Sequence, residues 1–234
     1  MMERFLFRIA KQWIAGDSMK QALESAQLAN KKGMDAIINR LGEHLTTKNQ
    51  VENTVKEYLV LVSHLQKSKV EGGVSIKPTQ LGLSRNKKEC LKNYEIIIER
   101  AVLSQSFVWI DMESSEHTDD TIGIYLDLFD KYERLGIAIQ ANLRRSRGDL
   151  MRLLEKGAKI RLVKGAYREK KEVAFQSKKE VDENYRNLME MLFVKGNEFG
   201  IATHDSVLIE KAVKLSKAYE KKFEFQMLKE FVMN

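Results

Sequence analysis

The sequence predicts an α/β fold, a (β/α)8 TIM-type barrel of which seven of the eight strands can be found. Two observations lead to this prediction. Apolar segments rich in β-branched and aromatic residues alternate with amphipathic segments of helical period along the chain. Polar residues also stand at or just after the end of one apolar segment after another. An open doubly wound sheet needs such residues only at its switch point, whereas all strands of a barrel end at one mouth.

Composition limits the class of protein. The 234 residues are 43% hydrophobic, which is enough for one large core, and we treat residues 1–234 as one domain. The net charge is +7, but the basic residues are scattered among acids, which argues against a nucleic-acid partner. The single cysteine, Cys90, fits a reducing compartment. Without an apolar run of membrane-spanning length or the features of a signal peptide, we expect a cytoplasmic protein.

The first half of the chain supplies two strands. An amphipathic entry helix is expected from the helical spacing of Phe5, Leu6, Ile9, Trp13 and Ile14. Helix 18–32 ends at a glycine and is followed by strand 34–39. Helix 48–69 is closed by Gly72 and Gly73, and strand 74–77 ends at Pro78, the only proline. Helix 87–104 follows, with an apolar stripe on one face.

The second half supplies the other five strands. Strand 107–111 is a β-rich apolar run that ends in a carboxylate, and helix 118–135 is expected to stop at Gly136. Strands are then expected at 137–141, 160–163, 201–203 and 223–227. The helices that separate them are expected at 146–156, 179–194 and 206–219. The order is therefore β then α, repeated along the chain.

Residues 159–169 form the stretch with the most chemistry. Arg161 and Lys164 place a guanidinium and an ammonium at the end of a buried strand, where an anionic substrate or cofactor would offset the cost of burial. Gly165 and Ala166 have almost no side chain, so a planar group could approach the backbone there. The other predicted strand ends carry further polar residues, namely Lys77, Asp111, Gln140, Thr203 with His204, and Gln226.

These residues alone leave three chemistries open. A Schiff-base lyase needs a lysine of lowered pKa, for which Lys77 and Lys164 are candidates. A metal-dependent hydrolase would take its ligands from Asp111, Glu113, His117 and His204, although their spacing matches no compact metal signature. A redox enzyme would use the cations and an amide to hold an electron-poor cofactor ring. We expect no metal at the mouth.

Six segments, in the same order and spacing along the chain as in a known family, carry a resemblance to that family. They are Arg161 to Tyr167, Ser75 to Gly82, Ile110 to Glu113 with His117 to Asp119, Ile139 to Ala141, Ala202 to Asp205, and Phe223 to Leu228. Together they resemble the proline dehydrogenases, FAD-dependent barrel enzymes that oxidise L-proline to 1-pyrroline-5-carboxylate. The resemblance implies FAD as the cofactor, L-proline as the substrate and a quinone as the electron acceptor. Transfer of electrons to a quinone implies peripheral contact with a membrane face.

The resemblance also implies a role for individual residues. Asp111 matches the active-site acid, and Arg161 matches the arginine beside the flavin N5 atom. Lys77 matches the lysine near the proline carboxylate, and Tyr167 resembles an aromatic residue of the substrate pocket. The positions that match FAD contacts are Met112, Gln140, Lys164, Gly165, Ala166, Thr203 and His204.

The last residues depart from the family pattern. After residue 228 the family continues into an eighth strand and a final helix whose paired arginines bind the proline carboxylate, and neither is found here. Adding one G before a permitted codon set for residues 230–234 encodes Gly-Ile-Arg-Asp-Glu, a continuation typical of the family. We therefore expect a frameshifted, truncated tail. The alternative to an active enzyme is an inactive remnant, or a half that needs a second polypeptide.

Overall fold

The structure is a computed structural model that describes residues 18–229. The expected entry helix and the tail at 230–234 lie outside these residues. The strands are β1 (Ala36–Asn39), β2 (Gly72–Ile76), β3 (Phe107–Ile110), β4 (Leu135–Gln140), β5 (Ile160–Val163), β6 (Glu198–Ala202) and β7 (Lys222–Gln226). The helices are α2 (Met19–Asn30), α3 (Lys48–Lys67), α4 (Lys87–Leu103), α5 (Thr118–Phe129), α6 (Ser146–Glu155), α7 (Lys178–Lys195) and α8 (Ser206–Ala218). Two 3-10 helices, η2 (Pro78–Leu81) and η3 (Ser115–His117), follow β2 and β3.

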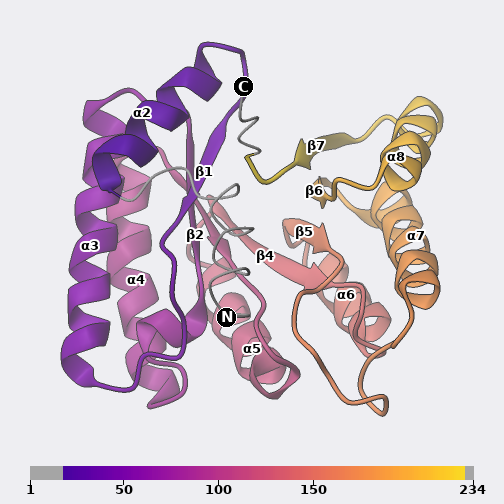
Figure 1. Cartoon of the computed structure of the whole chain (residues 1–234), viewed down its shortest axis with the longest axis horizontal. Helices are drawn as coiled ribbons and strands as arrows, with labels where there is room; N and C mark the ends of the chain where they lie inside the picture. Colours follow the sequence, from indigo (N-terminus) through magenta and orange to yellow (C-terminus); the bar gives the residue numbers. More distant parts are fainter. Residues whose placement is uncertain (1–17, 230–234) are drawn as a thin grey trace, which may run out of the picture.

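The strands form one seven-stranded parallel sheet in sequence order, β1 to β7. Figure 1 shows the sheet curled, with the helices forming an outer arc around it. Each crossover therefore returns on the same side of the sheet, as in a barrel. Within residues 18–229, β1 and β7 are the two edges of the sheet and do not pair with each other. The predicted α/β barrel architecture is confirmed as a curled, open barrel.

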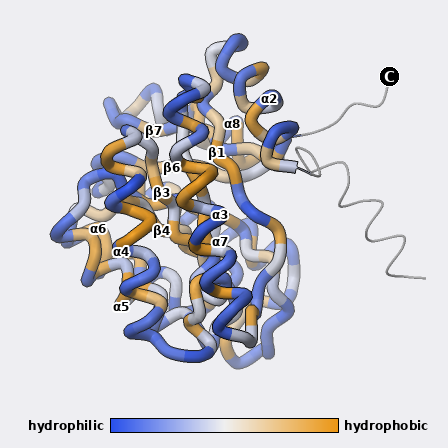
Figure 2. The backbone as a smooth tube through the Cα atoms, turned by 90° about the vertical axis from the view of Figure 1, so that its left-hand side faces the viewer, coloured by the Kyte–Doolittle hydropathy of each residue, from blue (hydrophilic) through white to orange (hydrophobic). Residues whose placement is uncertain are grey.

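Burial differs between the central and the edge strands. All six residues of β4 are buried, as are four of the five in β2. In β1 partly buried and exposed residues alternate, and three of the five residues of β7 are exposed. Helices cover the outside of the central strands, and neighbouring strands cover their edges. Figure 2 shows hydrophobic segments in the interior, along β3 and β4, and hydrophilic segments on the outer helix turns.

Several helices begin at polar residues that cap the free backbone N–H groups of the first turn. Ser18 accepts a hydrogen bond from the backbone of the first turn of α2, and Asp205 does the same for α8. Thr47 and Ser177 form capping boxes with Gln50 and Glu180. The predicted starts of these helices are therefore confirmed within one residue.

No helix of the described region is long and apolar enough to cross a bilayer.

Several expected boundaries differ from the structure; β6, for example, begins at Glu198 and not at residue 201. Glycines explain two of the differences. Helix α5 ends at Phe129 and not at residue 135, and Gly136 lies inside β4. A Cβ atom at Gly136 would lie 2.4 Å from the indole of Trp109, so this glycine makes room for a ring on the neighbouring strand. Gly72 and Gly73 are the first two residues of β2 and do not close α3, which ends at Lys67. Glycine marks a close approach between strands at these positions, not a helix end.

Buried tyrosines tie the outer helices to the ends of the strands. Tyr58 on α3 donates a hydrogen bond to the carbonyl of Ser75 at 3.1 Å, and Tyr94 on α4 donates to Ile76 at 2.9 Å. On the opposite side, Tyr185 on α7 donates to the carbonyl of Leu162 at 2.9 Å. A carbonyl at a strand end needs a partner when it is buried, and these hydroxyls supply one. They fix the strand ends that carry the polar residues of the mouth.

Candidate active site

A buried ion pair lies at the centre of the mouth. The guanidinium of Arg161, on β5, donates through Nη1 to Oδ1 of Asp111 at 2.9 Å. The hydroxyl of Ser75, on β2, joins them at 2.8 Å from Nη1 and 2.6 Å from Oδ1. Asn39, at the end of β1, donates to the other carboxylate oxygen at 2.7 Å. Four of the seven strands thus bring polar side chains to one point.

Arg161 is held on its other sides as well. Its guanidinium lies over the ring of Trp109, 4.5 Å from the ring centre, and Nε donates to Oε1 of Gln226 at 2.5 Å. The residue is only 8% exposed. Burial lowers the pKa of Arg161, and the charge of Asp111 opposes that effect, so the cation depends on its carboxylate partner. A buried cation with a fixed geometry can stabilise negative charge that develops nearby.

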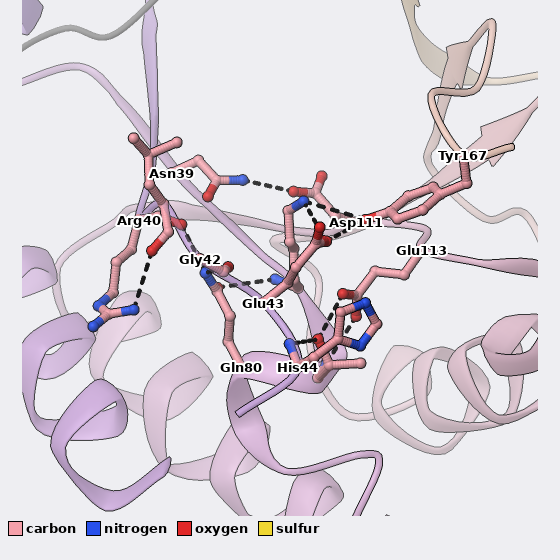
Figure 3. Close-up of polar contacts among 12 residues, drawn as sticks. Asn39, Arg40, Gly42, Glu43, His44, Gln80, Asp111, Glu113 and Tyr167 are labelled. Carbon is pink, nitrogen blue, oxygen red and sulfur yellow. Dashed lines mark hydrogen bonds and ion pairs between the residues drawn. The ribbon is translucent and has the colours of Figure 1, made fainter. Parts of the chain in front are cut away.

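A second cluster contains both predicted substrate-binding residues. Lys77 donates from Nζ to Glu43 at 3.0 Å and to the hydroxyl of Tyr167 at 3.3 Å. The Tyr167 hydroxyl also donates to Glu43, and Figure 3 shows the side chains of Tyr167 and Glu43 directed toward each other. Burial raises the pKa of Glu43, but the hydrogen bonds from Tyr167 and Lys77 outweigh it, so the net pKa is lowered. Burial and the bond to Glu43 raise the pKa of Tyr167, which stays a neutral hydroxyl donor.

Glu113 lies close to Glu43, and Gln140 is hydrogen-bonded to the backbone of Glu113. The carboxylate of Glu113 is fully buried and accepts hydrogen bonds from the backbone and hydroxyl of Thr79 at 2.8 and 2.6 Å. Burial raises the pKa of Glu113 in spite of these hydrogen bonds. The amide of Gln140 donates to the carbonyl of Glu113 at 2.8 Å. Met112, the neighbouring residue, is 7% exposed and belongs to the hydrophobic core.

Lys164 belongs to an ion-pair network separate from the Asp111 and Arg161 pair. Its ammonium pairs with Asp182 of α7 at 2.6 Å and with Asp205 before α8 at 2.8 Å. Lys178 pairs with the same two aspartates. Hydrogen bonds from Lys164 and Lys178 lower the pKa of Asp205. Two lysines and two aspartates thus form one ion-pair network that joins the segments after β5 and β6 to α7.

The backbone conformation and the packing at Gly165 both require a residue without a side chain. Its φ is +102°, in the left-handed region, and a Cβ atom there would lie 2.1 Å from Oδ1 of Asn142. The amide of Asn142 thus occupies the place that a Cβ atom of Gly165 would take. Ala166 is exposed. Oδ1 of Asn142 is buried and has no hydrogen-bond partner in the described part of the chain.

The end of β6 carries the last two predicted residues. Thr203 is 7% exposed, and its hydroxyl accepts a hydrogen bond from the backbone N–H of Asp205 at 3.1 Å. Nε2 of His204 accepts from the backbone N–H of Leu228 at 3.1 Å. His204 therefore contacts the segment after β7, and Thr203 stabilises the turn into α8.

Three residues of the mouth were missed by sequence reasoning. Asn39 and Ser75 bind the carboxylate of Asp111, and Glu43 binds Lys77 and Tyr167. Asn39 is the last residue of a predicted strand and Ser75 lies within another. A polar residue at such a position could have indicated that it faces the mouth. Glu43 follows a turn and has no motif around it, so only its contact with residues far along the chain identifies it.

A family model described as proline dehydrogenase matches residues 22–230. Proline dehydrogenase 1 of Bacillus subtilis is 30% identical over 222 residues, a match that covers 94% of this chain and 74% of that protein. Proline dehydrogenase of Deinococcus radiodurans is 29% identical over 231 residues, covering 95% and 74%. These are curated relatives that the chain matches over most of their length.

Solved structures of proline utilization A (PutA) show a similar fold. The PutA of Bdellovibrio bacteriovorus has a TM-score of 0.85 at 23% identity, and the PutA of Bradyrhizobium japonicum has 0.77 at 20%. The matches cover 97% of this chain but only 29% and 27% of those much longer chains. The family model and the curated relatives, at this coverage, establish membership. The chain belongs to the proline dehydrogenase family.

Proposed function

We propose that the chain oxidises L-proline to 1-pyrroline-5-carboxylate with FAD as its cofactor. The observation that carries this proposal is the buried pair of Arg161 and Asp111 at the strand ends, next to the cluster of Lys77 and Tyr167. The Arg161 and Asp111 pair offers a fixed cation for an electron-accepting ring. Lys77 and Tyr167 offer a cation and a hydroxyl for the carboxylate of a small substrate. Membership of the proline dehydrogenase family supports the same assignment.

The residues present fit a flavin. A flavin ring carries both hydrogen-bond acceptors and a ring N–H donor, so its site needs donors, a cation and an acceptor. Arg161 and Gln140 supply donors, and the buried Oδ1 of Asn142 is an acceptor without a partner in the described residues. When bound, FAD would accept the hydride from proline C5 at its N5 atom. The residues that we propose to hold it are Met112, Gln140, Lys164, Gly165, Ala166, Thr203 and His204.

Arg161 has the role of a charge stabiliser in this proposal. Reduction of a flavin leaves negative charge on its ring, and a guanidinium already desolvated and oriented stabilises that charge without rearrangement. Asp111 keeps Arg161 charged and in place, together with the hydroxyl of Ser75. Asp111 therefore acts on the reaction through the arginine that it holds.

Lys77 and Tyr167 form the substrate end of the proposed site. Lys77 is bound to Glu43 in the structure, and a substrate carboxylate would compete for the same ammonium. Hydride leaves proline more easily when the amine is neutral, so the substrate nitrogen has to lose a proton. The positive charges of Lys77 and Arg161 favour that loss because they disfavour a third cation nearby.

A visible absorption spectrum of the purified chain tests the proposal, followed by addition of proline without oxygen. We expect an oxidised flavin spectrum that bleaches with proline. Lys77→Ala should leave the flavin spectrum intact and slow the bleaching, whereas Lys67→Ala, on the outer end of α3, should change neither. A chain that neither carries flavin nor takes it up on reconstitution contradicts the proposal.

Within residues 18–229 the edges of β1 and β7 are unpaired, which favours a second candidate function. In this case the chain binds flavin, but turnover needs a further strand that pairs with these edges. The same experiment separates the two, because the flavin spectrum would then persist after proline is added. Restored bleaching on addition of a polypeptide that carries a further strand and helix would support this second function.

We further propose that the protein is cytoplasmic and delivers its electrons to a quinone at a membrane face. The net charge of +7 favours contact with an anionic surface, and the single cysteine fits a reducing compartment. Sedimentation with anionic vesicles should carry the protein down at low salt, and zwitterionic vesicles should not. Equal binding to both kinds of vesicle would contradict an electrostatic contact.

A further inference from the structure

The sequence predicted no metal at the mouth, but the structure brings a group of potential metal ligands together beside its substrate end. Glu43 and His44 come from the loop after β1, and Glu113 comes from the segment after β3. One ligand atom from each of the three residues lies within 4.8 Å of the other two. Figure 3 shows the imidazole of His44 next to the carboxylate of Glu113, with Glu43 close by. Residues far apart in the sequence thus present two carboxylates and an imidazole to one space.

Each of these side chains keeps a lone pair for an ion. Glu43 uses only Oε2 for its bonds to Lys77 and Tyr167, and its other oxygen accepts no hydrogen bond within residues 18–229. Each oxygen of Glu113 accepts one hydrogen bond from Thr79 and retains a second lone pair. The imidazole of His44 forms no hydrogen bond or ion pair with the described part of the chain. The three side chains therefore keep lone pairs that accept no hydrogen bond from the described residues and can coordinate an ion.

Two further contacts support a built site. Thr79 binds Glu113 through its hydroxyl and also accepts the backbone N–H of His44 at 2.9 Å, so one residue orients two ligands. The ring of His117, on η3, lies 6.2 Å from the ring of His44, measured between centres. This is close enough for a second imidazole to share the ion after a side-chain rotation. The donor set is then mixed nitrogen and oxygen.

We propose that Glu43, His44 and Glu113 bind one divalent transition-metal ion, with Zn²⁺ as the preferred ion and His117 as a fourth ligand. Zn²⁺ takes imidazole nitrogen and carboxylate oxygen at about 2.0–2.2 Å in tetrahedral sites, whereas Mg²⁺ and Ca²⁺ prefer oxygen alone. Lys77 is already paired with Glu43, so its positive charge is offset before an ion enters. The ion takes no part in electron transfer. It joins the loop after β1 to the segment after β3.

Calorimetric titration of the full chain with ZnCl₂, after removal of any affinity tag, tests the proposal. We expect saturation at one ion per chain, and Co²⁺ as a spectroscopic probe should give the intense visible bands of a tetrahedral site. Mutation of residues that only hydrogen-bond to a metal ligand typically lowers metal affinity about 10–100-fold. Loss of a ligand itself, in His44→Ala, should therefore lower Zn²⁺ affinity at least about tenfold. Glu113→Gln should lose a similar factor, with circular dichroism confirming that this buried variant folds.

His64→Ala is the matched control. This histidine lies on α3 and bonds through Nδ1 to the carbonyl of its own helix at Val60, 2.8 Å away. Its removal should leave Zn²⁺ affinity unchanged. The proposal is overturned if no binding saturates at one equivalent, if His44→Ala keeps the original affinity, or if His64→Ala loses as much as His44→Ala. None of these readouts depends on flavin or on proline oxidation.

Discussion

Asp111→Ala should destabilise the fold because it leaves the buried Arg161 without its counter-charge. The carboxylate accepts three hydrogen bonds, from Arg161 at 2.9 Å, Ser75 at 2.6 Å and Asn39 at 2.7 Å. The side chains of Arg161 and Asp111 are only 10% and 18% exposed. Removing one partner of a buried ion pair typically costs about 3–5 kcal/mol. Since water reaches part of Asp111, we expect a loss of about 3 kcal/mol in the free energy of unfolding.

A double-mutant cycle with Arg161→Met isolates this effect. Methionine keeps apolar contact with Trp109 but removes the charge that Asp111 compensates. In the Arg161→Met background, Asp111→Ala should cost no more than about 1 kcal/mol, because the loss of the hydrogen bonds to Ser75 and Asn39 is offset by removal of a largely buried carboxylate that has no counter-charge. Urea denaturation followed by circular dichroism gives each free energy, with equal m values required for comparison. The reasoning is refuted if Asp111→Ala costs the same in both backgrounds.

Three further changes test other parts of the mouth by the same denaturation assay. Gly165→Ala should cost about 1–3 kcal/mol, because alanine is strained at a φ of +102° and its Cβ would meet Asn142. Gly136→Ala should also cost about 1–3 kcal/mol, by overpacking against the ring of Trp109. Glu113→Gln should be more destabilising at about pH 5 than at about pH 8. The pKa of Glu113 is raised in the folded state, so its contribution to stability is present at low pH and is lost as pH rises through the folded pKa.

A control for the glycine changes is available on α6. A Cβ atom added at Gly148 would meet no atom within 4 Å, and its φ is not left-handed, so Gly148→Ala should stabilise the helix by about 0.5–1 kcal/mol. A neutral Gly165→Ala or Gly136→Ala would contradict the close approaches described at those positions. A Glu113→Gln effect that is independent of pH would contradict the raised pKa of the buried carboxylate.

The sequence predicted the order of strands and helices well because most elements satisfy local rules. Thr47 and Ser177 begin helices with capping boxes, and the apolar run at 160–163 is a buried strand. Boundaries at glycine were less predictable. The local pattern around Gly136 predicts a helix end, but this residue lies within a strand because Trp109, a residue of the neighbouring strand, needs the space. A glycine's local signal does not show which distant side chain approaches it.

The candidate site was predictable where a charged residue ends a strand. Parallel strands of a curled sheet end at the same mouth, so Asp111 and Arg161 were expected to lie near each other, and they form an ion pair. Glu43 could not be predicted in this way, since it lies in a loop whose path depends on the packing of η2 and β3. Lys164 was also expected at the mouth, but its pairing with Asp182 and Asp205 depends on the placement of α7 and α8.

The sequence by itself determined the alternation of strands and helices and the residue types at the strand ends, because hydrophobic period, caps and turn residues act over a few neighbouring positions. Only the tertiary structure decided which charges meet. It paired Arg161 with Asp111 and Lys77 with Glu43, and it filled the space at Gly165 with Asn142. Such contacts depend on the curvature of the sheet and on side-chain packing across strands, and these are properties of the whole fold.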